Sequence, residues 1–162
     1  MSVLPKKRLT PQQALPKLAH YCAYQERSHA EVKQKLASLG VFGNDAEHII
    51  SQLIADNYLN EERYARQFAQ GKHRMKGWGK IKIKHALQQQ QVSSFNITLA
   101  LQSIDMVAYE AKALQLAVQK SQHLPQGNYY TQQAKLISYL QQKGYESKVI
   151  QNALRQMKNA EE

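Results

Sequence analysis

A pattern that occurs three times along the 162 residues constrains the fold more than any other feature of the chain. The segment Val32–Leu36 aligns with residues 83–87 and 136–140, at offsets of 51 and 53 residues. Each copy is followed by two apolar residues four positions apart, which are Ile49 and Leu53, Ile97 and Leu101, and Ile150 and Leu154. The repeat predicts three tandem three-helix units, in which Leu36, Leu87 and Leu140 are equivalent core positions.

Helix start signals agree with this division. Apolar residues recur every three or four positions, and only seven glycines and four prolines interrupt them. Capping boxes are expected at Thr10 with Gln13 and at Ser28 with Glu31, and further N-caps at Asn60, Ser94, Asp105 and Thr131. We therefore expect an all-α fold of about nine helices in an elongated, curved array. The three repeats are expected at residues 10–58, 59–104 and 105–159.

One short segment favours a strand instead. Lys80-Ile81-Lys82-Ile83-Lys84 alternates between basic and apolar residues, as a half-buried strand does. The repeat, however, places Ile83 and Leu87 on one face of a helix, and the alternating run is short. We therefore predict a helix here.

Cysteine use and hydropathy restrict the compartment. Cys22 is the only cysteine, so the chain forms no internal disulfide, which is typical of a reducing environment. The basic segment Met1–Arg8 is followed by polar residues rather than an apolar stretch, so it does not resemble a signal peptide. No apolar run approaches the length that spans a membrane. These features predict a cytoplasmic protein without a membrane partner.

The charge is concentrated in the middle of the chain. The formal net charge is +10, from 22 basic and 12 acidic side chains. Residues 60–90 carry eight basic and two acidic side chains. Residues 1–59 and residues 91–162 each carry seven basic and five acidic side chains. This distribution favours a polyanionic partner, either nucleic acid or an acidic protein surface. The alternative is a solvated basic helix face that only maintains solubility.

The residues needed for catalysis are poorly represented. The six histidines form no HExxH motif, and a single cysteine adds little to a metal site. Glu61 and Glu62 are adjacent, so on a helix they point about 100° apart and do not face one substrate. Gly77-Trp78-Gly79-Lys80 lacks the hydroxyl residue and the first glycine of a phosphate-binding loop. We expect no enzyme activity, no cofactor and no metal.

The stretch from Leu59 to Leu87 carries the most specific pattern. It predicts a capped helix, a basic turn with glycines on both sides of Trp78, and a second basic helix in which Lys80 and Lys84 share a face. Trp78 either anchors the turn onto the core or stacks on a nucleic-acid base, and the pattern favours the anchor. Tyr21, Tyr64 and Tyr139 are likewise predicted to be core or boundary residues.

This stretch resembles the central motif of the RecX regulatory proteins. The similarity rests on Leu59-Asn60-Glu61-Glu62-Arg63-Tyr64-Ala65, the aromatic residue between glycines, and the basic helix. Upstream, residues 24–36 are similar to the family's Arg-x-Ser-x-x-Glu-Leu signature leading to Lys-Leu, with Val32 in place of the leucine. Gln91 departs from the glycine that usually follows the second-repeat helix. Residues 106–162 match mainly in helical pattern and length.

The resemblance implies tandem three-helix repeats, binding to RecA filaments that limits their growth or activity, roles in DNA repair, recombination and the SOS response, and no catalytic residues. It also implies contact with single- or double-stranded DNA through phosphates in some members. We expect a monomer, with the RecA or DNA contact at Arg63, Arg66, Lys72, Arg74, Lys76, Trp78, Lys80, Lys82 and Lys84. The main alternative is a stand-alone DNA-binding module of the helix-turn-helix type, and a nuclease is a weaker one.

Overall fold

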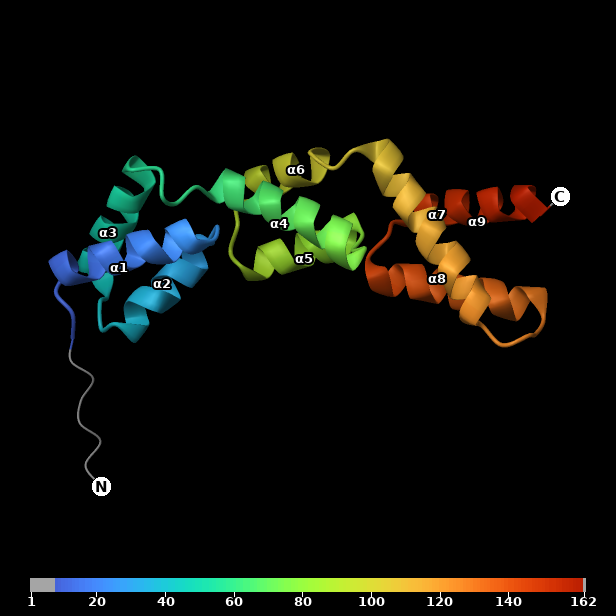
Figure 1. Cartoon of the computed structure of the whole chain (residues 1–162), viewed down its shortest axis with the longest axis horizontal. Helices are drawn as coiled ribbons and strands as arrows, with labels where there is room; N and C mark the ends of the chain where they lie inside the picture. The colour runs from blue at the N-terminus through green and yellow to red at the C-terminus, as the bar shows by residue number, and fades with distance from the viewer. Residues whose placement is uncertain (1–7, 162) are drawn as a thin grey trace, which may run out of the picture.

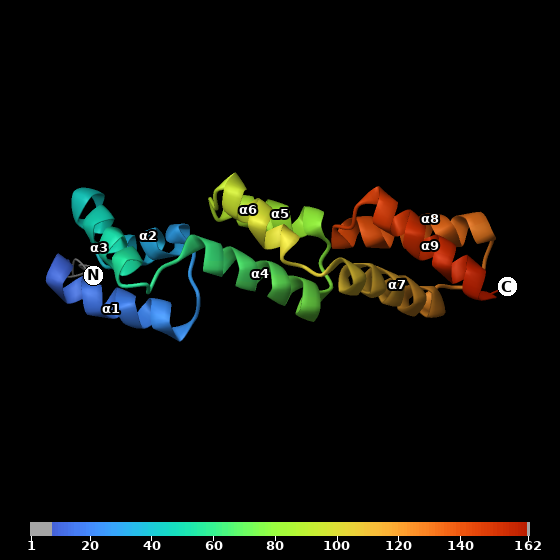
Figure 2. The same cartoon turned by 90° about the horizontal axis from the view of Figure 1, so that it is seen from above.

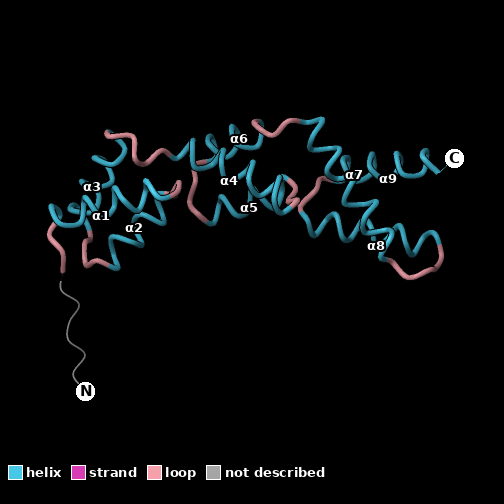
Figure 3. The backbone as a smooth tube through the Cα atoms, in the orientation of Figure 1, coloured by secondary structure: helices cyan, strands magenta, loops and turns pink. Residues whose placement is uncertain are grey.

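The computed structural model describes residues 8–161, and within them the chain forms nine helices and no strand (Figure 3). The helices are α1 (Pro11–Tyr24), α2 (His29–Ser38), α3 (Gly43–Ala55), α4 (Glu61–Lys76), α5 (Lys80–Gln89), α6 (Ser94–Gln102), α7 (Met106–His123), α8 (Tyr129–Lys143) and α9 (Ser147–Glu161). The predicted all-α fold is confirmed, and the alternating segment that begins at Lys80 is helical. The expectation for Met1–Arg8 falls almost entirely outside the described residues.

The helices form three groups of three that follow one another along an elongated molecule (Figure 1). Seen from above, α1, α4 and α7 lie along one long side, and the other two helices of each group lie along the opposite side (Figure 2). We propose residues 10–58, 59–104 and 105–159 as the first, second and third units, because each range contains one group, apart from the last two residues of α9. None of the nine helices is long and apolar enough to cross a membrane.

The predicted helix starts are mostly correct. Both capping boxes form, and the side chains of Asn60 and Asp105 accept the expected backbone N–H bonds. Two predicted N-caps are wrong. Ser93 caps α6 in place of Ser94, because its Oγ accepts from the N–H of Asn96. Asn128 caps α8 in place of Thr131, because its Oδ1 accepts from the N–H of Tyr130, so the helix begins at Tyr129.

The same left-handed turn closes the equivalent helix in each unit. Gly40, Gln91 and Gly144 follow α2, α5 and α8, with φ values of 78°, 60° and 97°. Glycine adopts this conformation without steric cost, whereas a residue with a Cβ is strained there. Gln91 nevertheless adopts it, so the departure from the glycine pattern leaves the turn intact.

The buried apolar residues form two separate cores. Leu36 lies at 0% exposure in the core of the first unit, with residues such as Leu18 and Leu53. Leu87 and Leu140 are equally buried, but they belong to one core that is continuous through the second and third units. The predicted equivalence of the three leucines is confirmed at the level of burial. The second and third units form one body, to which the first unit is joined without a shared core.

Candidate functional site at the basic junction

The basic turn predicted around Trp78 lies where the second unit packs against the third. Helix α4 ends at Lys76, and the φ of its C-cap residue Gly77, 67°, is left-handed. The N–H groups of Gly77 and Trp78 donate to the carbonyls of His73 and Lys72, at 3.0 and 3.2 Å. His73 Nδ1 lies 3.1 Å from the carbonyl oxygen of Trp78. These bonds satisfy the last carbonyls of α4 and hold the turn in one conformation.

Direct backbone contact with the third unit fixes the position of this turn. The N–H of Gly79 donates to the carbonyl of Lys143 at 2.7 Å, and the N–H of Ile81 donates to the carbonyl of Gly144 at 2.9 Å. A Cβ on Gly79 would lie 2.3 Å from the carbonyl carbon of Gly144, which is closer than real Cβ atoms approach. Glycine at position 79 therefore permits the start of α5 to meet the end of α8.

A buried tyrosine completes the junction beneath the turn. The Tyr109 hydroxyl accepts a hydrogen bond from the N–H of Lys80 at 2.9 Å and donates one to the Glu146 carboxylate. The Tyr109 ring lies 5.2 Å from the ring of His73 and 5.1 Å from that of Tyr145, measured between centroids. Burial and the bond to Glu146 raise the pKa of Tyr109, so the phenol stays neutral. The interior of the junction thus carries no phenolate.

Two lysines of the third unit lie at the end of α4. The contact residues predicted from the sequence all belong to the second unit and include neither of them. Lys112 Nζ lies 3.4 Å from the carbonyl oxygen of Arg74, and Lys143 Nζ lies 3.1 Å from that of Lys76. The carboxyl end of a helix carries partial negative charge, which attracts cations. The end of α4 therefore gathers basic side chains from two consecutive units, at positions 38 and 67 residues apart in the sequence.

The prediction that Trp78 anchors the turn is confirmed. Its ring is half-buried against the shared core and packs edge-on against Phe68, with a centroid separation of 6.4 Å. Two cations flank the ring: Lys72 Nζ lies 5.0 Å and Lys82 Nζ 4.7 Å from its centroid. Such contacts are attractive and bring two like charges close together. Trp78 therefore positions Lys72 and Lys82 at the surface of the turn.

The lysines of α5 divide between two flanks of the helix. Helical spacing places Lys80 and Lys84 on one side of the buried face and Lys82 on the other. Lys80 Nζ lies 5.0 Å from the centroid of Tyr109 and 3.3 Å from Met106 Sδ, whereas Lys84 is exposed. The structure therefore does not bring these three lysines to a single face.

Arg66 lies on the exposed side of α4. Its guanidinium pairs with Glu62 at 2.9 Å, as the spacing of four residues allows. About half of each side chain is exposed to solvent, so the pair is a weak surface salt bridge. Arg66 is accessible to a ligand that would displace Glu62.

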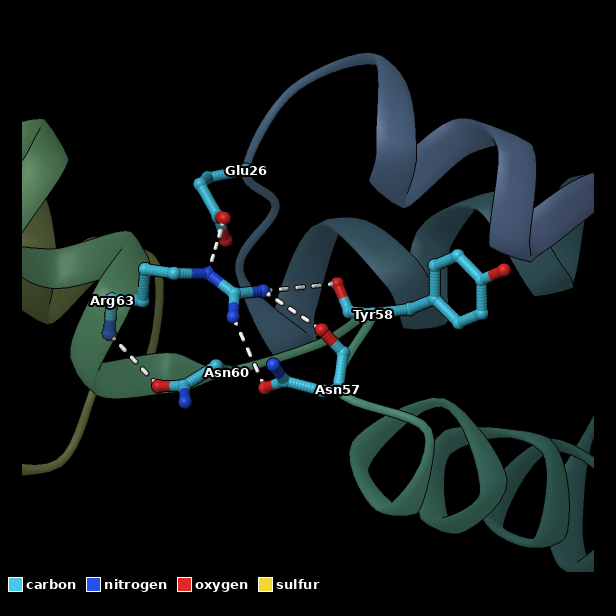
Figure 4. A network of polar contacts seen from close by, with 5 residues as sticks. All are labelled: Glu26, Asn57, Tyr58, Asn60 and Arg63. Carbon is cyan, nitrogen blue, oxygen red and sulfur yellow. Dashed lines mark hydrogen bonds and ion pairs between the residues drawn. The ribbon is translucent and has the colours of Figure 1, made fainter.

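Arg63 is used inside the molecule, at the joint between the first and second units (Figure 4). Its Nε donates to Glu26, and its terminal nitrogens donate to the side chain of Asn57 and to the backbone carbonyls of Asn57 and Tyr58. Ser28, fully buried, donates to Gln90 at 2.8 Å across the same joint. Because these bonds occupy the guanidinium, Arg63 is not available as a contact for RecA or DNA.

We call the six cations around the end of α4 and the turn that follows it the basic junction. They are Lys72, Arg74, Lys76, Lys82, Lys112 and Lys143. Arg74 and Lys76 are exposed, and between residues 8 and 161 their side chains form no ion pair. In the same range, no three histidine, cysteine, aspartate or glutamate side chains lie together as a metal site requires. The arrangement is suited to contacts with phosphates or carboxylates.

Two family models match the second and third units. They describe the second three-helix domain of RecX, at residues 60–101, and its third three-helix domain, at residues 108–154, and together they cover more than half of the chain. The chain belongs to the RecX family. The first of these matches contains most of the basic junction.

Curated relatives agree with this assignment. The chain is 27% identical over 148 residues to the regulatory protein RecX of Bacillus cereus (strain B4264) and 26% identical to that of Bacillus mycoides (strain KBAB4). Both alignments cover 91% of this chain but 55% of the relative, so the chain spans about half the length of these relatives.

Solved structures share the fold. The crystal structure of RecX from Lactobacillus salivarius superposes with a TM-score of 0.86 at 22% sequence identity, covering 92% of this chain and 97% of that one. A second crystal structure, of a regulatory protein RecX, superposes with a TM-score of 0.83 at 19% identity and covers 90% of this chain and 73% of that chain. The tandem arrangement of three-helix units is thus common to these RecX proteins.

Proposed function

We propose that this RecX-family chain binds RecA filaments on DNA and lowers their recombinase activity, using the basic junction as a principal contact. The observation that carries the proposal is the coincidence of the family match over residues 60–101 with the strongest cluster of cations in the chain. A filament of RecA on DNA offers phosphates and protein carboxylates along its length, and an elongated molecule is suited to contacts spread over several of its subunits.

The junction is suited to backbone phosphates rather than to base edges. Lysine side chains interact with phosphates without regard to sequence, and each phosphate contact makes binding more dependent on salt. Arg74 is the only arginine of the six, so few bidentate contacts to a guanine edge are available. Binding of this kind follows the shape and charge of the filament and not the DNA sequence.

A stand-alone helix-turn-helix module has less support. In that arrangement the last helix of a unit enters the major groove and presents polar and basic side chains to the bases. Helix α6, which would hold this position in the second unit, contains no lysine or arginine, and its most exposed large side chain is Phe95. The lysines and arginines of the unit lie instead on α4 and α5. We therefore assign DNA a role only together with RecA.

Regulation without catalysis is part of the proposal. The test is to titrate the purified chain into RecA assembled on single-stranded DNA and to follow ATP hydrolysis, strand exchange and binding of the labelled chain. We expect lower RecA activity in both assays, and no hydrolysis of ATP or DNA by the chain alone. Unchanged RecA activity at saturating chain contradicts the proposal. Equal affinity for naked DNA at the same salt concentration favours a stand-alone DNA-binding protein.

A further inference from the structure

The first unit separates its charges in a way that the sequence does not reveal. Residues 10–58 carry four basic and five acidic side chains, which is close to balance. In the structure, Asp45 and Glu47 lie on α3 and Asp56 lies at its end. Lys17 and Lys35 lie on α1 and α2, where they line a groove together with Arg27. The groove between α1 and α2 is therefore lined by cations, although the unit is nearly neutral and Glu31 also lies on α2.

This groove has an apolar floor and a cationic rim. Its volume is about 510 Å³, with Pro16, Tyr21 and Leu39 supplying apolar surface and no acidic residue in its lining. Lys17 is exposed, and Lys35 is half-buried with its Nζ 5.6 Å from the centroid of Tyr21. A concave apolar surface bordered by cations is complementary to an apolar side chain flanked by carboxylates.

Arg27 gives one wall of the groove a fixed shape. Its guanidinium lies over the ring of Tyr21, 3.7 Å from the centroid, and its Nε donates to the carbonyl of Tyr21 at 3.0 Å. Glu31 pairs with the same guanidinium at 3.7 Å and offsets part of its charge. Lys17 and Lys35 therefore supply most of the uncompensated positive charge.

The occupied face of Tyr21 favours a peptide over single-stranded nucleic acid. Proteins that bind single strands stack successive bases on open aromatic faces. Arg27 covers one face of Tyr21, so of the two tyrosines in the groove only Tyr24, at 78% exposure, is widely open. A concave floor, in contrast, encloses a leucine or phenylalanine side chain, as the buried centres of protein interfaces do.

We propose that the groove between α1 and α2 binds an acidic amphipathic segment of a partner protein. An apolar side chain of the segment lies between Tyr21 and Leu39, and its carboxylates face Lys17 and Lys35. The groove belongs to the first unit, whose core is separate from that of the basic junction. The proposal does not depend on RecA being the partner, so it and the function proposed above are tested independently.

The test uses a fluorescein-labelled synthetic peptide in which leucine and phenylalanine alternate with aspartate and glutamate, with binding to the full chain followed by anisotropy. The groove variant combines K17E and K35E. A matched variant combines K33E and K158E, which reverse two exposed lysines outside the groove.

Amide chemical shifts of the chain locate the bound peptide, and labelled oligothymidine serves as the competing probe. Two control peptides replace either the acidic residues by lysine or the apolar residues by serine.

The expected result is binding that the groove variant weakens by about tenfold, since two charge contacts become repulsive, while the matched variant changes it by less than about twofold. Shift changes centred on Tyr21 and Leu39, and loss of binding for both control peptides, complete the support. The proposal is overturned if the acidic peptide does not bind, or if both variants weaken it equally. Oligothymidine that displaces the peptide and loses affinity only for the groove variant assigns the groove to nucleic acid instead.

Discussion

Gly79 and Gly144 pack backbone to backbone across the junction: a Cβ on Gly79 would lie 2.3 Å from the carbonyl carbon and oxygen of Gly144. This contact positions the basic turn relative to the third unit. Because the opposing atoms belong to the backbone, they cannot move aside as the end of a flexible side chain does. The contact therefore tests whether the junction depends on close packing of the two units.

Replacement of Gly79 by alanine should separate α5 from the end of α8. We expect Gly79→Ala to lower the free energy of unfolding by about 3 kcal/mol, the upper range for overpacking a close contact. Gly71→Ala is the control: Gly71 lies inside α4 and an added Cβ meets only Met75 Cε, at 3.6 Å. It should stabilise by about 1 kcal/mol, because alanine favours a helix interior. Urea unfolding measures both, and equal effects would show that the close contact is unimportant.

The two cores should unfold as separate units. Replacing Leu36, Leu87 or Leu140 by alanine should cost about 2–5 kcal/mol, because each side chain is fully buried. Trp78, the only tryptophan, packs on the shared core, so its fluorescence reports the second and third units alone. We expect Leu87→Ala and Leu140→Ala to shift the urea midpoint of this signal.

Leu36→Ala provides the contrast for that measurement. It should lower the midpoint for part of the circular dichroism signal and leave the midpoint of Trp78 fluorescence nearly unchanged, since Leu36 lies in the core of the first unit. A single transition that all three variants shift equally would mean that the chain unfolds as one unit.

The joint between the first and second units should depend on Arg63. Arg63→Ala removes the donors that bind Glu26 and the Asn57 and Tyr58 carbonyls, and no shared core replaces them. We expect a broader distribution of distances between spin labels on Glu47→Cys and Gln151→Cys, and a loss of about 1 kcal/mol in stability. Arg66→Ala, which removes only a surface pair with Glu62, should change neither quantity measurably. Identical distance distributions in the two variants argue against a joint held by Arg63.

Alkaline pH should destabilise the fold through its buried tyrosines. Burial and the neighbouring Glu31 carboxylate raise the pKa of Tyr64 to about 12. A pKa raised in the folded state stabilises the fold at pH values below the unfolded pKa of about 10, and this contribution disappears as pH rises through 12. Tyr64→Phe should therefore make the free energy of unfolding fall less steeply over this window.

Tyr130→Phe is the matched control for the pH series, because Tyr130 is 79% exposed. Urea unfolding at a series of alkaline pH values compares the two variants, which carry the same lysines. The same decline in both would mean that the Tyr64 phenol does not contribute to the pH dependence.

The sequence predicts local structure well, because helix starts and core positions depend on near neighbours. The capping box of Ser28 with Glu31 and the burial of Leu87 follow from spacings of three and four residues. The two wrongly predicted N-caps also result from reliance on near neighbours, because each helix start has two suitable capping residues close together. Ser93 and Ser94 are chemically equal candidates, and Asn128 lies three residues before an equally plausible Thr131.

The site was less predictable, because its geometry depends on packing between units. Lys143 lies 67 residues from Lys76, and Glu26 lies 37 from Arg63, and no periodicity links either pair. Charge counting placed the basic segment in the middle of the chain, but it did not distinguish Arg63, held at the joint, from Arg74, which is exposed. Nor did it indicate that Lys112 and Lys143 of the third unit lie at the same helix end.

The packing also changes the design of the charge-reversal experiment. The sequence alone suggests reversing Lys76, Lys80 and Lys84, with Lys135, Lys143 and Lys148 as the matched control. In the structure, Lys80 contacts Tyr109 and Lys143 belongs to the basic junction. The better junction triple is therefore Arg74, Lys76 and Lys82, and the better control is Lys135, Lys148 and Lys158; Lys82 is half-buried and the other five are exposed.

Binding of these two triple glutamate variants to RecA filaments on single-stranded DNA, measured over a salt series, tests the central claim most directly. We expect the junction triple to lose affinity by more than about tenfold at low salt and to lose less at high salt, where ions screen the attraction. The control triple should lose less than about threefold, and both should retain the helix content of the unchanged chain. Equal losses for the two triples would mean that the filament senses only net charge, and a larger loss for the control would place the contact in the third unit.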